Sequence, residues 1–193
     1  MTESEFIDFW NKTYPNSHPI NHELKWVYPD RWFRIHNLPE SKRYARSESE
    51  YTIILNRQNQ LINDLIGEGS EIAISFGYYS DNLTENCEIE QTDFGAFHKS
   101  LTIDLHRERP NEFDEPTYFD VYVKIANWKN NSQDQMLKAI ADDEFRAMVI
   151  SLSTGLIIAP YDGGVDVITE SKLETDKLKL KYKDWLSTRE DGM

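Results

Sequence analysis

The segment from Arg31 to Ala45 holds the residues best suited to binding a ligand. Its cationic side chains include Arg34, His36, Lys42 and Arg43, and aromatic side chains are interleaved with them. Arginines beside aromatic rings can stack on planar groups and bind anions through paired N–H donors. We therefore take these four residues as a candidate anion-binding site. In the alternative interpretation, the segment is a strand followed by a Pro-containing turn, and its arginines pair with acids across a sheet.

A second candidate site consists of three carboxylates, Asp104, Asp120 and Asp166. Each lies in a predicted strand, out of phase with the apolar residues, so the three could share one sheet face if their strands are neighbours. Close carboxylates raise one another's pKa or hold a hard cation such as Mg²⁺. In the alternative interpretation they are the polar half of a half-exposed sheet.

Other chemistry has little support in the sequence. His18 and His22 are four residues apart, but Pro19 lies between them and no HExxH pattern is present, so we expect no metal site. Cys87 is surrounded by acids, which suppress the reactive thiolate. No GxSxG, GxGxxG or GxxxxGK[ST] pattern occurs. We therefore expect neither a serine nucleophile nor a nucleotide cofactor, and no cofactor of another kind is indicated.

The charge of the chain is strongly acidic and unevenly distributed. The 193 residues carry a formal net charge of −13, with a local −8 over residues 81–120 and +4 over residues 25–46. The overall charge argues against nucleic-acid binding and suits a basic protein partner. We expect the two oppositely charged segments to lie near each other and partly neutralise. The acids assigned to a partner surface are Glu85, Glu88, Glu90 and Asp93.

The start of the chain and its hydropathy bear on location and domain number. The first fifteen residues have no cationic or apolar signal region, and no apolar run reaches the roughly 18 residues that a membrane span needs. Cys87 is the only cysteine, which excludes an internal disulfide. These features predict a cytoplasmic protein of bacterial type with no membrane segment. Length and the absence of repeats predict one domain over residues 1–193, with residues 1–30 as an N-terminal helix and wrapping loop.

Periodicity predicts an α+β fold. Capping-box spacings follow Thr2, Ser47 and Ser171, and a further helix is expected after Ser132. The packed helices are expected at 48–66, 133–146 and 171–187, with the N-terminal helix at an edge. Alternating segments predict strands near 72–78, 101–105, 119–125, 148–152, 156–159 and 165–168. We therefore expect a mostly antiparallel sheet of about five or six strands packed against three or four helices, with one face covered and one face wetter.

Two local features give sharper expectations. Asp162-Gly163-Gly164 is predicted to be a turn in which at least one glycine has a positive φ and the Asp162 side chain accepts a backbone N–H. Segment 14–30 is expected to be an ordered loop that buries Trp26 and Tyr28. The predicted core comprises Tyr51, Leu55, Leu61, Ile62, Leu65, Phe76, Val121, Val123, Ile150 and Trp185.

Three stretches of the chain resemble a known group of proteins. They are RWFRIHNLPESKRYA (31–45), IIAPYDGGVDVI (157–168) and DWLSTREDGM (184–193). Together they resemble a family of uncharacterised bacterial proteins with a tryptophan–arginine–histidine strand, a Leu-Pro-Glu-Ser-Lys-Arg-Tyr stretch and a late Tyr-Asp-Gly-Gly turn. The resemblance covers roughly residues 25–193. It implies no particular activity, substrate or catalytic residue.

Three functions are consistent with these observations. The first is a non-enzymatic acidic binding protein, such as an immunity or inhibitor protein whose cationic partner is attracted by the acidic segment. The second is a small-anion-binding protein or enzyme that uses Arg34, His36 and Arg43 or the three carboxylates. The third is a structural or regulatory domain. We favour the first, because the chain is small and acidic and contains no recognisable catalytic motif.

Overall fold

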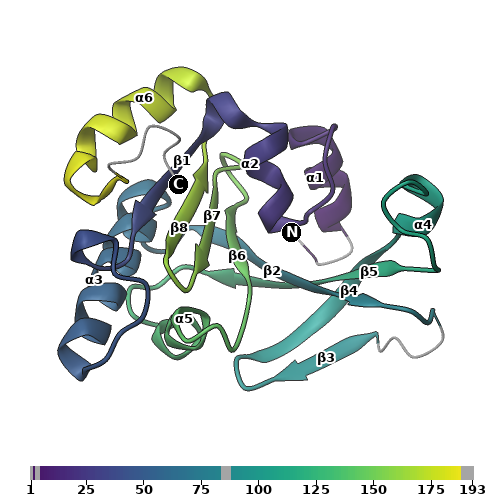
Figure 1. The fold of residues 1–193 in the computed structure, drawn as a ribbon, viewed down its shortest axis with the longest axis horizontal. Helices are drawn as coiled ribbons and strands as arrows, with labels where there is room; N and C mark the ends of the chain where they lie inside the picture. The colour runs from purple at the N-terminus through teal and green to yellow at the C-terminus, as the bar shows by residue number, and fades with distance from the viewer. Residues whose placement is uncertain (1, 3–4, 84–87, 188–193) are drawn as a thin grey trace.

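The computed structural model describes all residues except 1, 3–4, 84–87 and 188–193. Its centre is one eight-stranded sheet in the order β1-β8-β7-β6-β2-β5-β4-β3, and every neighbouring pair is antiparallel (Figure 1). The strands are β1 (Trp32–His36), β2 (Glu71–Ser80), β3 (Ile89–Thr92), β4 (Gly95–Asp104), β5 (Tyr118–Asn127), β6 (Met148–Ser151), β7 (Ile157–Tyr161) and β8 (Gly164–Ile168). The α-helices are α1 (Phe6–Thr13), α2 (Leu24–Val27), α3 (Glu48–Leu65), α4 (Leu105–Glu108), α5 (Asp134–Ala141) and α6 (Lys172–Lys181).

The antiparallel α+β class is confirmed, but the predicted number of elements is too low. The described residues form eight strands and six α-helices, against the five or six strands and three or four helices expected. The missed elements are short. Both α2 and α4 have four residues, and β3 has four residues within an acidic segment. Elements of this length contain too few residues to show a clear period.

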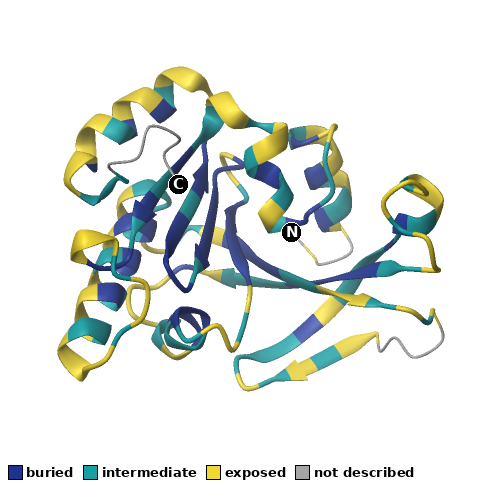
Figure 2. Cartoon of the chain, viewed as in Figure 1, coloured by how far each residue is buried: buried dark blue, intermediate teal, exposed yellow. Residues whose placement is uncertain are grey.

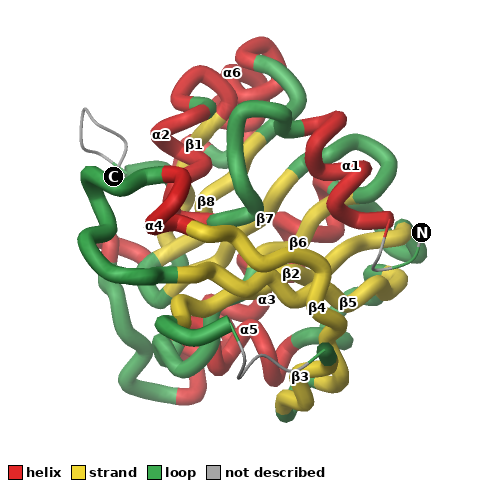
Figure 3. The backbone as a smooth tube through the Cα atoms, turned by 90° about the vertical axis from the view of Figure 1, so that its right-hand side faces the viewer, coloured by secondary structure: helices red, strands yellow, loops and turns green. Residues whose placement is uncertain are grey.

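Helices cover both faces of the sheet, so the expectation of one wetter face is wrong over much of its area. One core cluster joins α3, α5 and α6 to strand residues such as Ile72 and Val149. A second cluster joins α1 and α2 to the opposite face, through residues such as Trp10 and Leu24. Figure 2 shows the central strands as mostly buried and the β3–β4 region as mainly a mixture of half-buried and exposed residues. The tube view in Figure 3 shows the same sheet from the side.

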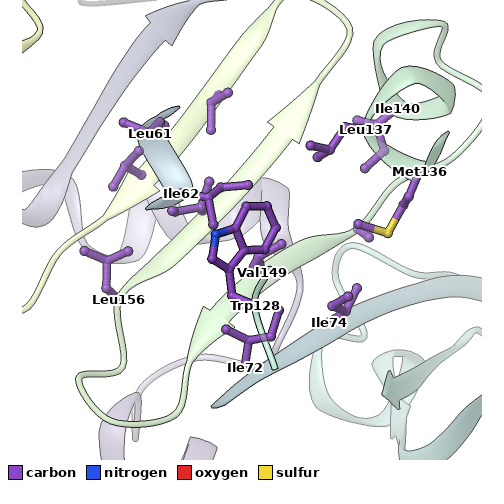
Figure 4. Close-up of a cluster of buried hydrophobic side chains, with 14 of the residues drawn as sticks. Leu61, Ile62, Ile72, Ile74, Trp128, Met136, Leu137, Ile140, Val149 and Leu156 are labelled. Carbon is purple, nitrogen blue, oxygen red and sulfur yellow. The ribbon is translucent and has the colours of Figure 1, made fainter. Parts of the chain in front are cut away.

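The core under α3 and α5 is built around Trp128, which is 1% exposed (Figure 4). Leu61 and Ile62 of α3 and Met136 and Leu137 of α5 belong to the same cluster. Half of the predicted core is fully buried, namely Leu61, Ile62, Val121, Val123 and Ile150. The other half is only partly buried, namely Tyr51, Leu55, Leu65, Phe76 and Trp185. Periodicity thus found the correct faces, while the depth of burial depends on neighbouring elements.

Local capping signals located the starts of α3 and α6, although α6 ends at Lys181 and not at residue 187 as predicted. The Ser47 hydroxyl accepts the Glu50 N–H at the start of α3, and the Ser171 hydroxyl accepts the Glu174 N–H at the start of α6. Gly67, with a φ of 87°, follows α3 and takes the left-handed conformation that ends many helices. These interactions satisfy backbone groups that a helix terminus would otherwise leave without partners.

Segment 14–30 contains short helical turns instead of the expected loop. Its elements are 3₁₀ turns at Asn21–Glu23 and Pro29–Arg31, with α2 between them. Leu24 is buried, whereas Trp26 is 68% exposed, so the expected burial of Trp26 is wrong. Tyr28 packs against the second core cluster as expected. One turn of helix can direct only one side of the segment inward, and that side carries Leu24.

Candidate functional site

The three stretches singled out in the sequence meet at one end of the sheet. Strand β1 pairs with β8, so that Arg34 lies opposite Asp166 and His36 lies opposite Gly164. Leu186 forms an isolated bridge with Ile35 on β1. The 31–45 stretch, the β7–β8 hairpin and the described part of the 184–193 stretch are therefore adjacent in space (Figure 1).

Arg34 forms a bidentate ion pair with Asp166. Its Nε and Nη2 donate to the two carboxylate oxygens over 2.7 and 2.8 Å, and both side chains are only 13% exposed. The guanidinium also lies 4.6 Å from the centre of the Tyr161 ring. Cross-strand register places these groups together, and this arrangement matches the structural alternative for the segment.

Arg43 makes a similar contact from the loop that precedes α3. Its Nε and Nη2 donate to Asp162 over 2.6 and 3.1 Å, and the Asp162 side chain is 4% exposed. Burial alone would raise the pKa of Asp162, but hydrogen bonds from Arg43 and Tyr44 lower that pKa overall. Lys42 pairs with Glu50 of α3 instead of joining Arg43.

His36 does not join the two arginine pairs in one site. Its Nε2 is buried without a hydrogen-bond partner. Burial and the nearby Arg34 charge lower the pKa of His36. The residue lines a separate hollow of about 230 Å³ with Arg57 and Trp185. The four residues grouped by the sequence thus do not form one site. Arg34 and Arg43 each pair with an aspartate, Lys42 pairs with Glu50, and His36 is half-buried apart from them.

The turn at Asp162-Gly163-Gly164 exists, but the predicted backbone conformation is wrong. Neither Gly163 nor Gly164 has a positive φ. The reason for glycine at 164 is close approach, because a Cβ there would lie 2.1 Å from the Ile35 carbonyl oxygen of β1. The glycine therefore allows β1 to pair tightly with the β7–β8 hairpin.

The three candidate carboxylates do not cluster. Asp120 on β5 and Asp166 on β8 are separated by β2, β6 and β7. Asp120 is fully buried and pairs with Lys99 at 2.8 Å. Asp104 caps α4 by accepting the Arg107 N–H at 2.9 Å. Strands β4 and β5 are neighbours, but β8 is not beside either of them, so the condition that all three strands be neighbours fails.

The expected contact between the basic and acidic segments fails for their strands, β1 and β3. Strand β1 forms one edge of the sheet and β3 forms the other, although Val27 of the basic segment and Glu108 of the acidic segment line one hollow. The basic segment instead finds its acids in the β7–β8 hairpin and at Glu50. Local charge runs therefore did not identify their partners.

The acidic residues assigned to a partner surface lie at the β3 end. Glu88 and Asp93 are exposed and Glu90 is half-buried, whereas Glu85 lies outside the described residues. Within the described part of the chain, no ion pair involves Glu88, Glu90 or Asp93. We call Glu88, Glu90 and Asp93, with the β3–β4 hairpin that carries them, the acidic hairpin.

Sequence reasoning missed a groove on the sheet face that carries α1 and α2. Two hollows of about 220 and 250 Å³ adjoin there and share Asn21, His22 and Arg146. Most of the residues that line the two hollows lie on β2, β5, β6 and β7, in the 19–25 segment and in the loop before β6. No local pattern marks such a groove, because its residues are distant in the sequence.

The described residues contain neither a candidate metal site nor a membrane-spanning helix. No group of three or more histidine, cysteine, aspartate or glutamate side chains is placed to hold a metal ion in that part of the chain. None of the described helices combines the length and the apolar character that a bilayer span requires. Cys87 lies outside the described residues.

Together these features define an antiparallel α+β protein with an arginine–aspartate end and an acidic end. A family model for a domain of unknown function, DUF3885, matches residues 20–190, and the chain belongs to that family. No curated protein matches the chain. No solved structure matches it either.

Proposed function

We propose that the protein is a non-enzymatic binding protein of the inhibitor or immunity type, and that its acidic hairpin binds a basic protein partner. The observation that carries this proposal is the exposure of Glu88 and Asp93, with Glu90 half-buried beside them, where no described cation pairs with them. Acids on an exposed element that have no ion-pair partner keep their negative electrostatic potential, which speeds association with a cationic surface.

The backbone at this end of the sheet supports the same proposal. Strand β3 is an edge strand and pairs only with β4 among the described strands. An edge strand presents N–H and C=O groups that another chain can bond. Exposed apolar side chains lie close by in the sequence, with Leu83 at 54% and Ile89 at 46%. The surface therefore combines charge, apolar area and backbone groups, which are the usual components of a protein interface.

The opposite end of the sheet supports a structural role for its cations. Arg34 and Arg43 are held by Asp166 and Asp162, and the carboxylates of these partners are largely or fully covered. Each of these two cations is partly neutralised by its aspartate, so the β1 end is a weaker candidate than the acidic hairpin for the surface that binds a protein partner.

The test compares two variants of equal charge change. Glu88, Glu90 and Asp93 are replaced by lysine in the first variant. Glu68, Glu144 and Glu170, which are exposed elsewhere, are replaced by lysine in the second. Both variants and the wild-type protein are used as baits in lysate of the native host, and a retained basic protein is purified and titrated by calorimetry against all three.

The expected result is one basic protein that binds the wild-type chain and the second variant but not the first. Its binding should weaken strongly in about 1 M salt, where the screening length falls to about 3 Å. The proposal fails if no basic protein is retained at low salt, or if the two variants bind the purified protein equally.

A further inference from the structure

The groove over the α1/α2 face owes its space to small residues on the sheet. Ser75 and Gly77 follow Ala73 on this face of β2, and Ala159 occupies the corresponding face of β7. A Cβ on Gly77 would lie 2.4 Å from the Phe119 ring, so the ring covers that strand directly. Larger side chains at these sheet positions would fill the hollows. The groove therefore exists because the sheet residues beneath it are small.

One end of the groove is lined by more cations than acids. Lys25, Arg34, Arg43 and Arg146 line the first hollow together with three aspartates. Arg43 uses Nε and Nη2 to bind Asp162, and Arg146 uses Nη2 to bind Asp143. A guanidinium has five N–H donors, so each of these two arginines keeps donors beyond its aspartate contact. Both side chains are well exposed, at 62% and 74%.

Asp143 interacts with both of these arginines. Asp143 pairs with Arg146 at 3.3 Å, and its charge also acts on Arg43. Arg146 in turn acts on His22 at the junction of the two hollows. Electrostatic interactions thus connect Arg43, Asp143, Arg146 and His22, from one end of the groove to its centre.

The other end of the groove is largely apolar. Pro19, Phe119 and Met148 line the second hollow, and Tyr79 adds a ring that is 48% exposed. Tyr79 Oη lies 3.4 Å from His22 Nε2. Desolvation lowers the pKa of His22, which favours its neutral imidazole. A neutral ring beside aromatic and apolar side chains suits the flat body of an organic ligand.

We propose that this groove binds a small organic anion, with its phosphate or carboxylate at Arg43 and Arg146 and its flat apolar body between His22 and Phe119. The site is independent of the acidic hairpin, because the two share none of their assigned residues. It also differs from the four-residue site suggested by the sequence, since His36 and Lys42 take no part.

The probe is phenyl phosphate, which carries an anion and a flat ring. It is titrated into the full chain by calorimetry and by NMR of the histidine rings, with the His22 signal assigned from a His22→Gln variant. Inorganic phosphate tests the anion alone, and benzyl alcohol tests the ring alone. We expect phenyl phosphate to bind more tightly than either and to shift the His22 signal, because only this probe reaches both ends of the groove.

Arginine variants locate the anion. Arg146→Gln and Arg43→Gln should each weaken phenyl phosphate binding about tenfold, because each removes a charge-assisted hydrogen bond. The matched control is Arg107→Gln, an exposed arginine on α4 outside the groove, which should bind as the wild-type chain does. Thermal melting shows whether each variant remains folded, and Arg146 is exposed enough that folding should persist.

The proposal is overturned by any of three results. The first is the absence of heat and of a His22 shift at millimolar phenyl phosphate. The second is equal weakening by Arg107→Gln, which would indicate general attraction of the anion to surface cations. The third is binding by inorganic phosphate that matches phenyl phosphate, which would remove the role of the apolar end.

Discussion

The two ends of the sheet use charge in different ways. At the β1 end, Arg34 and Arg43 are each held by an aspartate of the β7–β8 hairpin. At the β3 end, the one fully buried acid, Asp120, is paired with Lys99, while the described acids of the acidic hairpin have no ion pair. A run of like charge in a sequence therefore does not say whether its charges serve the fold. Only the neighbouring strand decides that.

Asp120 shows how strongly a buried charge depends on its neighbours. Its carboxylate contacts Lys99 on β4 and accepts hydrogen bonds from the Thr102 and Ser80 hydroxyls. These groups come from the strands on either side of β5. The network joins β2, β5 and β4, and it anchors the strand to which the acidic hairpin is attached.

The largest expected effect is on this network. Asp120→Ala should lower the free energy of unfolding by about 3–5 kcal/mol, because Lys99, only 14% exposed, is left without its partner. Urea unfolding followed by circular dichroism measures the change. Asp93→Ala, an exposed acid on the same hairpin, is the control and should leave stability unchanged. Equal losses of unfolding free energy in the two variants would contradict the distinction between the buried, paired Asp120 and the exposed Asp93.

The next largest effect is expected at the β1 end. Arg34→Ala should cost about 2–4 kcal/mol, because it leaves the mostly covered Asp166 carboxylate unpaired. This exceeds the roughly 0–1 kcal/mol of an exposed pair. A double-mutant cycle with Asp166→Ala measures the coupling of the two side chains. A coupling near zero would mean that the pair is only a surface contact, and that the contrast between the ends is weaker than the burial indicates.

Arg43→Ala should have a smaller effect, about 1 kcal/mol. The arginine is mostly exposed, so most of the cost comes from leaving the covered Asp162 carboxylate with only its Tyr44 and Gly163 donors. Urea unfolding measures it against Arg107→Ala, an exposed arginine on α4. A loss as large as that of Arg34→Ala would contradict the ranking of the two pairs by burial.

The smallest expected effect is a pH dependence at Asp162. Its pKa is lower in the folded protein than the roughly 3.9 of an unfolded aspartate. Its ionised form therefore contributes stability above about pH 4, and that contribution is lost as the pH falls through the folded pKa. Asp162→Asn should differ most from the wild-type chain near neutral pH and least in acid, as measured by urea unfolding across this range. A pH profile of Asp162→Asn that runs parallel to that of the wild-type chain would contradict the assignment.

The sequence by itself determined the elements whose signals are local. The caps at Ser47 and Ser171, the apolar stripe of α3 and the β6–β7 hairpin were all read correctly, because each depends on residues within a few positions of one another. The alternation of β2 and β5 also gave the faces that Ile72 and Val121 occupy. Periods of 2 and 3.6 suffice for such features.

Only the tertiary structure decided which residues meet. The sheet order places β8 beside β1 and separates Asp120 from Asp166, and no local period encodes the neighbours of a strand. The same order gave Arg34 its aspartate, required glycine at 164 through contact with Ile35, and brought His22 and Arg146 to one groove. Such long-range pairings follow from how the whole chain covers its apolar surface, so they appear only when every element is in place.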